Sequence, residues 1–378
     1  MTCPEMKALW EKYINGNATE EEQNHLEMHL QECEKCSEFF NQQLDEVEPK
    51  AIDKKKNQLQ YIDFSDSLRK AKWKQRFSLT LFIIAVIIFV LIIGTLSSQF
   101  YYSGKKLEQI STIETAAVES LLPNVHSQGG SMNRKSFFRM ENQMDLAKSI
   151  GNEGKFVGQI KLSHSFSKVS NVEKRWNGGR YDLKLYFVHP SLKANDDLNH
   201  WNEEFWKAIE KLPEGTVSEV ALSFDKPYTI EEMDGMLSKV FLDERKMPIW
   251  YALDTGESDQ EDPYLGPGQV LGFYRYFNLD KESESKNYTK EQRVKKLIQL
   301  LAENEDTVQN MQITFGKLSL NNSYQYIKKN GVKIYGVVLT GPTKEFLQLK
   351  DMEQIKFASL GDVELWNWYD RPVSGEMR

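Results

Sequence analysis

The chain has 378 residues and a formal net charge of −7. This length allows two or three modules with a substantial core. The charge is uneven, because residues 1–48 carry three lysines against twelve acidic residues and residues 49–76 carry nine bases against three acids. An acidic first module argues against direct nucleic-acid binding, since phosphate contacts need a basic face. It suits a basic protein partner, with a merely soluble acidic surface as the alternative.

The first 50 residues predict three short helices. The first runs from about Pro4 to Ile14, and the turn Asn15–Asn17 follows it. Thr19 and Glu22 make a capping box for the second helix, and the third begins near Cys36. The apolar residues of these helices are few: Met6, Leu9, Trp10, Tyr13, Ile14, Leu26, Leu30, Phe39, Phe40 and Leu44. So small a core would be marginal alone, and a bound metal ion would supply the missing folding energy.

The three cysteines of the chain and one histidine form a candidate metal site. Cys3, His29, Cys33 and Cys36 have the spacing C-x25-H-x3-C-x2-C. His29 and Cys33 would share one side of a helix, Cys36 follows one turn later, and Cys3 would fold back to complete a tetrahedron. Four such ligands suit a structural Zn²⁺, and His25 is expected to lie outside the set. The alternatives are unmetallated thiols, or a redox switch in which Cys33 or Cys36 leaves the metal on oxidation.

A membrane span follows this module. The segment from Phe77 to Leu96 contains 20 residues without a charge, enough to cross about 30 Å of hydrocarbon. A buried helix of a soluble core is the alternative. The bases that flank it lie mostly on the N-terminal side: Arg69, Lys70, Lys72, Lys74 and Arg76 before it, and Lys105 and Lys106 after it. The positive-inside rule then predicts a cytoplasmic N-terminus and an extracytoplasmic C-terminus. A reducing cytoplasm would also keep the thiols available for metal.

The pattern of Cys3, His29, Cys33 and Cys36, followed by one membrane helix, resembles the zinc-binding anti-sigma factors of bacteria. This resemblance covers residues 1 to about 50. It implies a small helical domain that clamps an extracytoplasmic-function sigma factor and blocks its contact with RNA polymerase. Many family members have His as the first ligand, where this chain has Cys3.

The same resemblance implies which residues contact the sigma factor. On the first helix we expect contacts from Leu9, Trp10 and Tyr13. A further helix over about Leu59 to Lys74 would add contacts from Leu59, Ile62 and Leu68. The alternative for this second segment is a juxtamembrane helix that lies on anionic lipid through its bases.

The remaining residues, 97–378, predict alternating strands and helices. We expect a stalk helix over Gln99 to Leu122, broken by Pro123 and by Ser127–Ser131. The predicted strands are Phe156–Leu162, Tyr181–Val188, Val217–Phe224, Ile249–Leu253, Val270–Phe277 and Val332–Leu339. The predicted helices are Asn195–Leu212, two that follow capping boxes at Thr229 and Thr289, Tyr324–Asn330 before Gly331, and a short one after Pro342. The segments around the third and sixth strands look alike, which indicates either a duplicated unit or chance.

This outer part is similar to the sigma-factor-regulator domains found on Gram-positive anti-sigma factors, through Ser67–Lys72 and Trp250–Asp254. It contains no catalytic constellation: it has no H-E-x-x-H, no Walker loop and no G-x-S-x-G motif. Its histidines are scattered and no cysteine lies near them, so we name no catalytic residue and expect no enzyme.

The sequence therefore predicts a multi-domain chain. Residues 1–50 would form an all-α zinc-binding domain, 51–76 a basic juxtamembrane linker, 77–96 the span, 97–130 a stalk, and 131–378 an extracytoplasmic α/β (α+β) sensor domain. The predicted function is that of a membrane-bound anti-sigma factor that releases its sigma factor on an envelope signal, with a second membrane regulator or a protease as further partners and no direct contact with nucleic acid. The alternatives are a zinc and thiol redox sensor with another partner, and a membrane-anchored envelope enzyme.

Overall fold

A computed structural model describes residues 3–46, 64–179, 184–192, 196–256, 264–277, 279, 288–314 and 318–369. The chain divides into two compact units, Met1–Ile83 and Ile84–Arg378. The predicted contact residues Leu59 and Ile62 lie outside the described residues.

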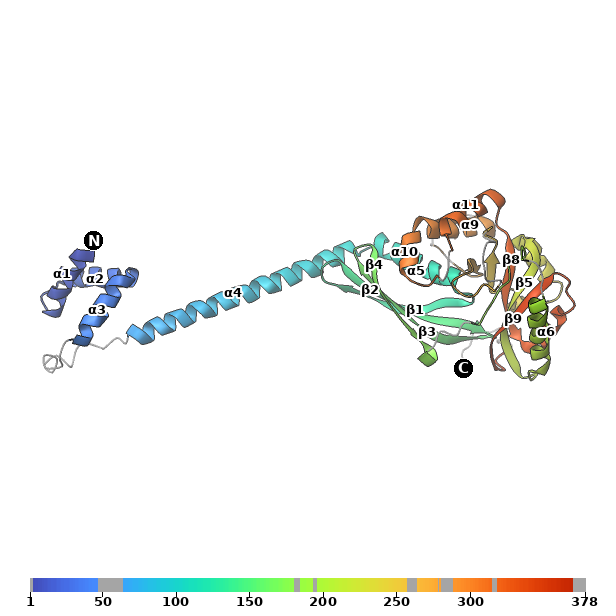
Figure 1. The fold of residues 1–378 in the computed structure, drawn as a ribbon, viewed down its shortest axis with the longest axis horizontal. Coiled ribbons are helices and arrows are strands. Elements are labelled where there is room, and N and C mark those ends of the chain that lie inside the picture. Colours follow the sequence, from blue (N-terminus) through green and yellow to red (C-terminus); the bar gives the residue numbers. More distant parts are fainter. Residues whose placement is uncertain are drawn as a thin grey trace, which may run out of the picture. The chain divides into compact units, whose positions relative to one another are not determined.

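The first unit contains three helices, α1 (Cys3–Ile14), α2 (Glu20–Glu32) and α3 (Glu34–Glu46), as the sequence predicts (Figure 1). The capping box at the start of α2 is present, since the Thr19 side chain accepts from the Glu22 N–H and the Glu22 carboxylate accepts from the Thr19 N–H. Gly16 makes the preceding turn with φ +69°, a left-handed conformation that glycine adopts without a Cβ clash. The core of this unit is one small cluster: Met6, Trp10, Leu26, Cys36 and Phe40.

A single helix, α4 (Phe64–Tyr101), follows and contains the predicted span. Within it, Lys72–Tyr101 is long and apolar enough to cross a membrane by length and composition, with a mean hydropathy of 3.1. The side chains from Phe77 to Ile93 are exposed on the surface of the helix. Exposed apolar surface of this extent is what a lipid-facing helix presents.

The expected helix over Gln99 to Leu122 is confirmed over most of its length, but it is interrupted, because the segment forms the end of α4 and a second helix. The chain leaves the helical conformation after α4, passes Gly104 at φ +56°, and begins α5 (Lys105–Leu121). Helix α5 is not a free-standing stalk, since Ala117, Val118 and Leu121 are fully buried in the core of the second unit.

A four-stranded antiparallel meander comes next: β1 (Val125–Lys135), β2 (Arg139–Ile150), β3 (Glu153–Ser165) and β4 (Lys168–Trp176). Only β3 was predicted. Helix α5 ends at Leu121, before Pro123, as expected, but Ser127–Ser131 belong to β1, which has a bulge between Ser127 and Gly129. Gly130 serves close strand approach there, since a Cβ would lie 2.0 Å from the carbonyl oxygen of Gln143.

The second sheet has five antiparallel strands in the order β7-β6-β8-β5-β9. They are β5 (Thr216–Tyr228), β6 (Trp250–Leu253), β7 (Gly272–Tyr274), β8 (Ile334–Pro342) and β9 (Ile355–Leu365). Two antiparallel sheets make the second unit an α+β fold. The predicted strand Tyr181–Val188 is wrong over its described part, 184–188, where only an isolated bridge joins Phe187 to Leu265.

The helices of the second unit mostly follow the prediction. They are α6 (Asp196–Lys211), α7 (Ile230–Leu237), α9 (Lys290–Glu303), α10 (Glu305–Asn310) and α11 (Leu320–Asn330), with the short 3-10 helices η2 (Asn177–Gly179), η3 (Glu244–Lys246) and η4 (Thr343–Leu349). The capping boxes at Thr229 and Thr289 are confirmed, as is Gly331 at the end of α11 with φ +80°. Strands β5 and β8 of the two similar segments are antiparallel neighbours, and a duplicated unit stays a prediction.

A buried ion pair joins the two sheets. The ammonium of Lys148 on β2 donates to the carboxylate of Glu219 on β5 at 2.5 Å, and both side chains are fully buried. The Nδ2 of Asn124 donates to the other oxygen of Glu219, also at 2.5 Å. The carboxylate of Asp362 on β9 lies 3.7 Å from Lys148. These partners satisfy charges that would be expensive to bury alone.

Candidate functional site

The four predicted metal ligands come from all three helices of the first unit. Cys3 is the first residue of α1, His29 lies in the last turn of α2, and Cys36 lies in the first turn of α3. Cys33 is the extended residue between α2 and α3, with φ −114° and ψ 100°. The bend at Cys33 turns the chain so that α2 and α3 both direct a ligand to the same point.

The geometry of these side chains fits one tetrahedral metal ion. Their ligand atoms all lie within 4.8 Å of one another. Cys3 Sγ lies 3.8 Å from Cys33 Sγ and 4.0 Å from His29 Nε2. Two thiolates bound about 2.3 Å from one zinc ion at the tetrahedral angle would lie about 3.8 Å apart. His25, one turn before His29, is exposed and does not belong to the group.

The local environments of two of the thiols shift their pKa values in opposite directions. The backbone N–H of Cys36 donates toward Cys33 Sγ, which lowers the pKa of the Cys33 thiol. Burial raises the pKa of the Cys36 thiol to about 11, because its thiolate would lose contact with water. A metal cation at the cluster would supply the positive charge that a buried thiolate needs.

The residues predicted to contact the partner differ in how deeply they are buried. Trp10 is buried, with its ring stacked on Phe40 at 4.4 Å, so it belongs to the core of the unit. Leu9 is half-buried against that core, and Tyr13 is 39% exposed. Leu68 lies in α4, but its side chain is outside the description. On α1, therefore, Tyr13 is the predicted contact residue with the most surface available to a partner.

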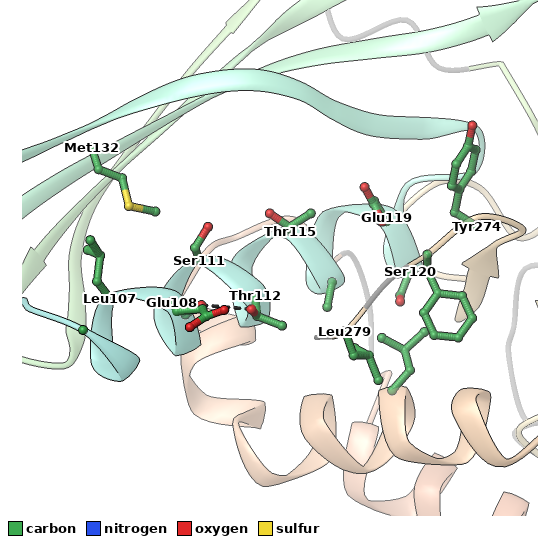
Figure 2. A pocket seen from close by; sticks show the side chains of 14 residues that line it. Leu107, Glu108, Ser111, Thr112, Thr115, Glu119, Ser120, Met132, Tyr274 and Leu279 are labelled. Atoms are coloured by element: carbon green, nitrogen blue, oxygen red, sulfur yellow. Dashed lines mark hydrogen bonds between the residues drawn. The ribbon is translucent and has the colours of Figure 1, made fainter. Parts of the chain in front are cut away.

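The second unit has a cavity of about 570 Å³ that sequence reasoning missed (Figure 2). One wall is α5, which contributes Glu108, Ser111, Thr112, Thr115, Glu119 and Ser120. Leu107 of α5 adds an apolar side chain, and apolar and aromatic side chains from other segments complete the lining, among them Met132, Tyr274, Phe277 and Leu297. The hydroxyl of Ser120 is buried and has no hydrogen-bond partner among the described residues. No motif marked this site, because its lining comes from segments far apart in the chain.

Burial controls the electrostatics of this cavity. It raises the pKa of Glu119 to about 7, against the opposing effect of a hydrogen bond from the Ser127 backbone. It also raises the pKa of Tyr274 and lowers that of His126, whose ring stacks on Tyr274 at 5.4 Å. Among the described residues, the lining contains carboxyl groups and hydroxyls and no Lys or Arg. These described residues favour neutral or cationic ligands over anions.

Known proteins resemble this chain along its length. Residues 65–155 match the family described as sigma factor regulator N-terminal, and residues 209–362 match the family described as sigma factor regulator C-terminal. The chain is 28% identical over 393 residues to the probable anti-sigma-M factor YhdL of Bacillus subtilis (strain 168), an alignment that covers 97% of this chain and 100% of that protein. No solved structure matches.

The two family matches follow the architecture. The N-terminal match covers most of α4 and all of α5, β1 and β2. The C-terminal match covers all of β5, β6, β7 and β8 and most of β9. The full-length similarity extends the relationship to the helical first unit, where the candidate metal ligands lie. The chain therefore belongs to the sigma factor regulator family of anti-sigma factors.

Proposed function

We propose that this protein is a membrane-anchored anti-sigma factor, which holds an extracytoplasmic-function sigma factor inactive and releases it on a signal received by its second unit. The observation that carries the proposal is the full-length similarity to a probable anti-sigma factor, together with matches to both sigma factor regulator families. The arrangement of one small helical unit, one apolar helix and one large α+β unit agrees with such a role.

In this proposal, the first unit binds the sigma factor and Zn²⁺ holds its helices in the binding geometry. Cys3, His29, Cys33 and Cys36 would supply a complete set of four ligands, so the ion would be structural and would have no open position for chemistry. Among its described residues the unit buries five side chains in its core cluster, and metal binding would therefore contribute much of its folding free energy. Tyr13 and its exposed neighbour Ile14 would offer apolar surface to the sigma factor.

Helix α4 would carry the link through the membrane. Five bases precede the apolar segment and two follow it, which supports a cytoplasmic first unit and an extracytoplasmic second unit. The second unit would sense the envelope, and the cavity beside α5 is a candidate site for its input because α5 follows directly on α4. Whether release uses a second membrane protein, a protease or loss of the metal stays a prediction.

A genetic experiment tests this function. Deleting the gene should raise transcription from the promoters of one sigma factor, and the wild-type chain should restore repression. The Cys33→Ser variant, expressed at the same level in the membrane, should restore it poorly. An unchanged transcript profile after deletion would contradict the proposed function.

A further inference from the structure

Two β-hairpin tips in the second unit carry exposed aromatic side chains. The turn between β1 and β2 contains Phe137 and Phe138, and the turn between β3 and β4 contains Phe166. All three have positive φ values, between 54° and 60°, which are unfavourable for bulky residues. The rings of Phe138 and Phe166 stack at 4.8 Å, while Phe137 and Phe166 remain 45% and 51% exposed. The sequence thus places large apolar side chains at turn positions where small polar residues are usual.

These tips pack on the end of α4. A Cβ on Gly94 would lie 2.8 Å from a ring carbon of Phe137, so the ring lies directly on the glycine. The N–H of Phe137 donates to the carbonyl oxygen of Gly94 at 3.0 Å, and the hydroxyls of Thr95 and Ser136 lie 2.8 Å apart. Gly94 is two residues before Leu96, the end of the uncharged segment. At 1.5 Å per residue, the tip therefore meets the helix about 3 Å inside that end.

The backbone at these tips has hydrogen-bond partners within the protein. The N–H of Phe138 donates to the Ser98 hydroxyl at 2.7 Å, and the N–H of Phe166 donates to the carbonyl oxygen of Phe138 at 2.8 Å. The Tyr102 hydroxyl lies 2.8 Å from the carbonyl oxygen of Phe138 and 2.5 Å from that of Phe166. Irregular backbone is tolerated at membrane depth only when its polar groups are satisfied in this way.

Basic residues flank the aromatic tips in the chain: Arg134 and Lys135 end β1, Arg139 begins β2, and Lys168 begins β4. The Lys106 ammonium lies 3.8 Å from the centre of the Tyr101 ring, which contacts the rings of Phe138 and Phe166. Arg134 donates to the Gln99 side chain at 2.8 Å, and Lys135 pairs with Glu141 at 3.3 Å. Such a surface fits a membrane that contains anionic lipid. The aromatic rings can lie at the boundary of the acyl chains, and the basic side chains can bind the lipid phosphates.

We propose that these two hairpin tips insert into the outer leaflet beside the membrane span, with Phe137, Phe138 and Phe166 at the acyl boundary and the neighbouring bases at lipid phosphates. The proposal rests on α4 spanning the membrane and does not depend on the sigma factor. Insertion would bury the exposed faces of Phe137 and Phe166 and fix the four-stranded sheet to the span. A change in that sheet would then act directly on the membrane helix.

The test uses the full-length chain in nanodiscs that contain anionic lipid. Phe137→Cys and Phe166→Cys are made separately, and each is reacted with a charged maleimide that does not partition into lipid. Labelling is read for each peptide by mass spectrometry, so reaction of the three native cysteines is counted apart. A cysteine buried in lipid should react at least about tenfold more slowly than one exposed to water, because its thiolate is disfavoured in lipid and the charged reagent is excluded.

Phe156→Cys is the matched control. Phe156 lies on the same sheet and is 43% exposed, but it pairs with Ala147, eight residues along β2 from Arg139 at the tip. This separation is about 27 Å at the rise of an antiparallel strand. Circular dichroism and equal labelling in denaturant establish that each variant is folded and reactive. Slow labelling at both tip positions, relative to position 156, is the expected result. Labelling at either tip position as fast as at position 156 would overturn the proposal.

Discussion

The Sγ atoms of Cys3 and Cys33 lie 3.8 Å apart, although thirty positions separate the two residues in the chain. This distance closes the three helices of the first unit around one point, at which His29 and Cys36 also arrive. The same helices leave Tyr13 exposed and bury Trp10. Cys3 begins α1 and Tyr13 lies at its other end, so the metal would hold the helices in shape at a point away from the residue proposed to bind the sigma factor.

Replacing a ligand should unfold the first unit. Cys33→Ser removes one of four ligands, and the zinc content should fall from about one ion per chain to well below it, with loss of helical structure in this unit. Zinc analysis of the purified full-length chain and hydrogen exchange of α1 to α3 measure the two effects. His25→Ala is the control, since His25 is exposed on the same helix and outside the cluster. Equal zinc content in Cys33→Ser and the wild type would contradict the assigned ligands.

Two aromatic residues of α1 should behave differently when truncated. Tyr13→Ala should weaken sigma factor binding, by roughly tenfold if Tyr13 is an interface anchor, and leave the fold intact. Trp10→Ala should instead destabilise the unit by about 3 kcal/mol, because it empties the centre of the core. Binding assays and hydrogen exchange on the full-length chain separate the two. Normal binding by a folded Tyr13→Ala variant would remove Tyr13 from the proposed surface.

Removing one member of the buried ion pair between Lys148 and Glu219 should destabilise the second unit. Glu219→Gln removes the closer of the two carboxylates beside the buried Lys148 ammonium and leaves Asp362 at 3.7 Å, so the opening free energy of β5 amides should fall by about 3 kcal/mol. The double replacement Lys148→Met with Glu219→Leu should recover much of this loss.

Glu204→Gln is the matched control for that measurement, because Glu204 pairs with Lys207 at 3.1 Å on the exposed face of α6. Exposed pairs contribute little, so hydrogen exchange should barely change. If Glu219→Gln changed the exchange of β5 as little as this control does, the ion pair would not be what joins the sheets.

The stability of the second unit should depend on pH through Glu119. Its pKa is raised from 4.5 to about 7 by burial, so between these values the folded state binds more protons than the unfolded state. Stability should therefore fall as pH rises from about 4.5 to about 7, by at most about 3 kcal/mol. Glu119→Gln should remove this slope and leave the unit more stable above pH 7.

Thermal unfolding at a series of pH values measures that slope. Glu108→Gln serves as the control, because Glu108 is exposed on the same helix and lines the same cavity. An unchanged slope in Glu119→Gln, or an equal change in Glu108→Gln, would contradict the assignment to Glu119.

Local sequence signals predicted most helices and the grouping of the four candidate metal ligands. The capping boxes at Thr19, Thr229 and Thr289 depend on residues three positions apart, so they can be read directly from the chain. The ligands His29, Cys33 and Cys36 are likewise close in sequence. Cys3 was placed by its residue type alone, as no other cysteine remained for the fourth position.

The meander of β1 to β4 was largely missed because its strands are polar and contain turn-forming residues. Gly129 and Gly130 were interpreted only as part of a helix break, yet they also lie in a bulged and closely paired strand. No local pattern marks Lys148 and Glu219 as a pair, since only the folded structure brings the two charges together. The strand expected over Tyr181–Val188 has alternating apolar residues, but its Phe187 makes only a single bridge.

The most direct test of the central claim is affinity purification of the tagged full-length chain from membranes of its source organism, with mass spectrometry of bound proteins and zinc analysis of the same sample. The account predicts one small sigma factor in stoichiometric amount with about one zinc per chain, and loss of both in the Cys33→Ser variant. Zinc-loaded wild-type chain that carries no sigma factor would contradict it.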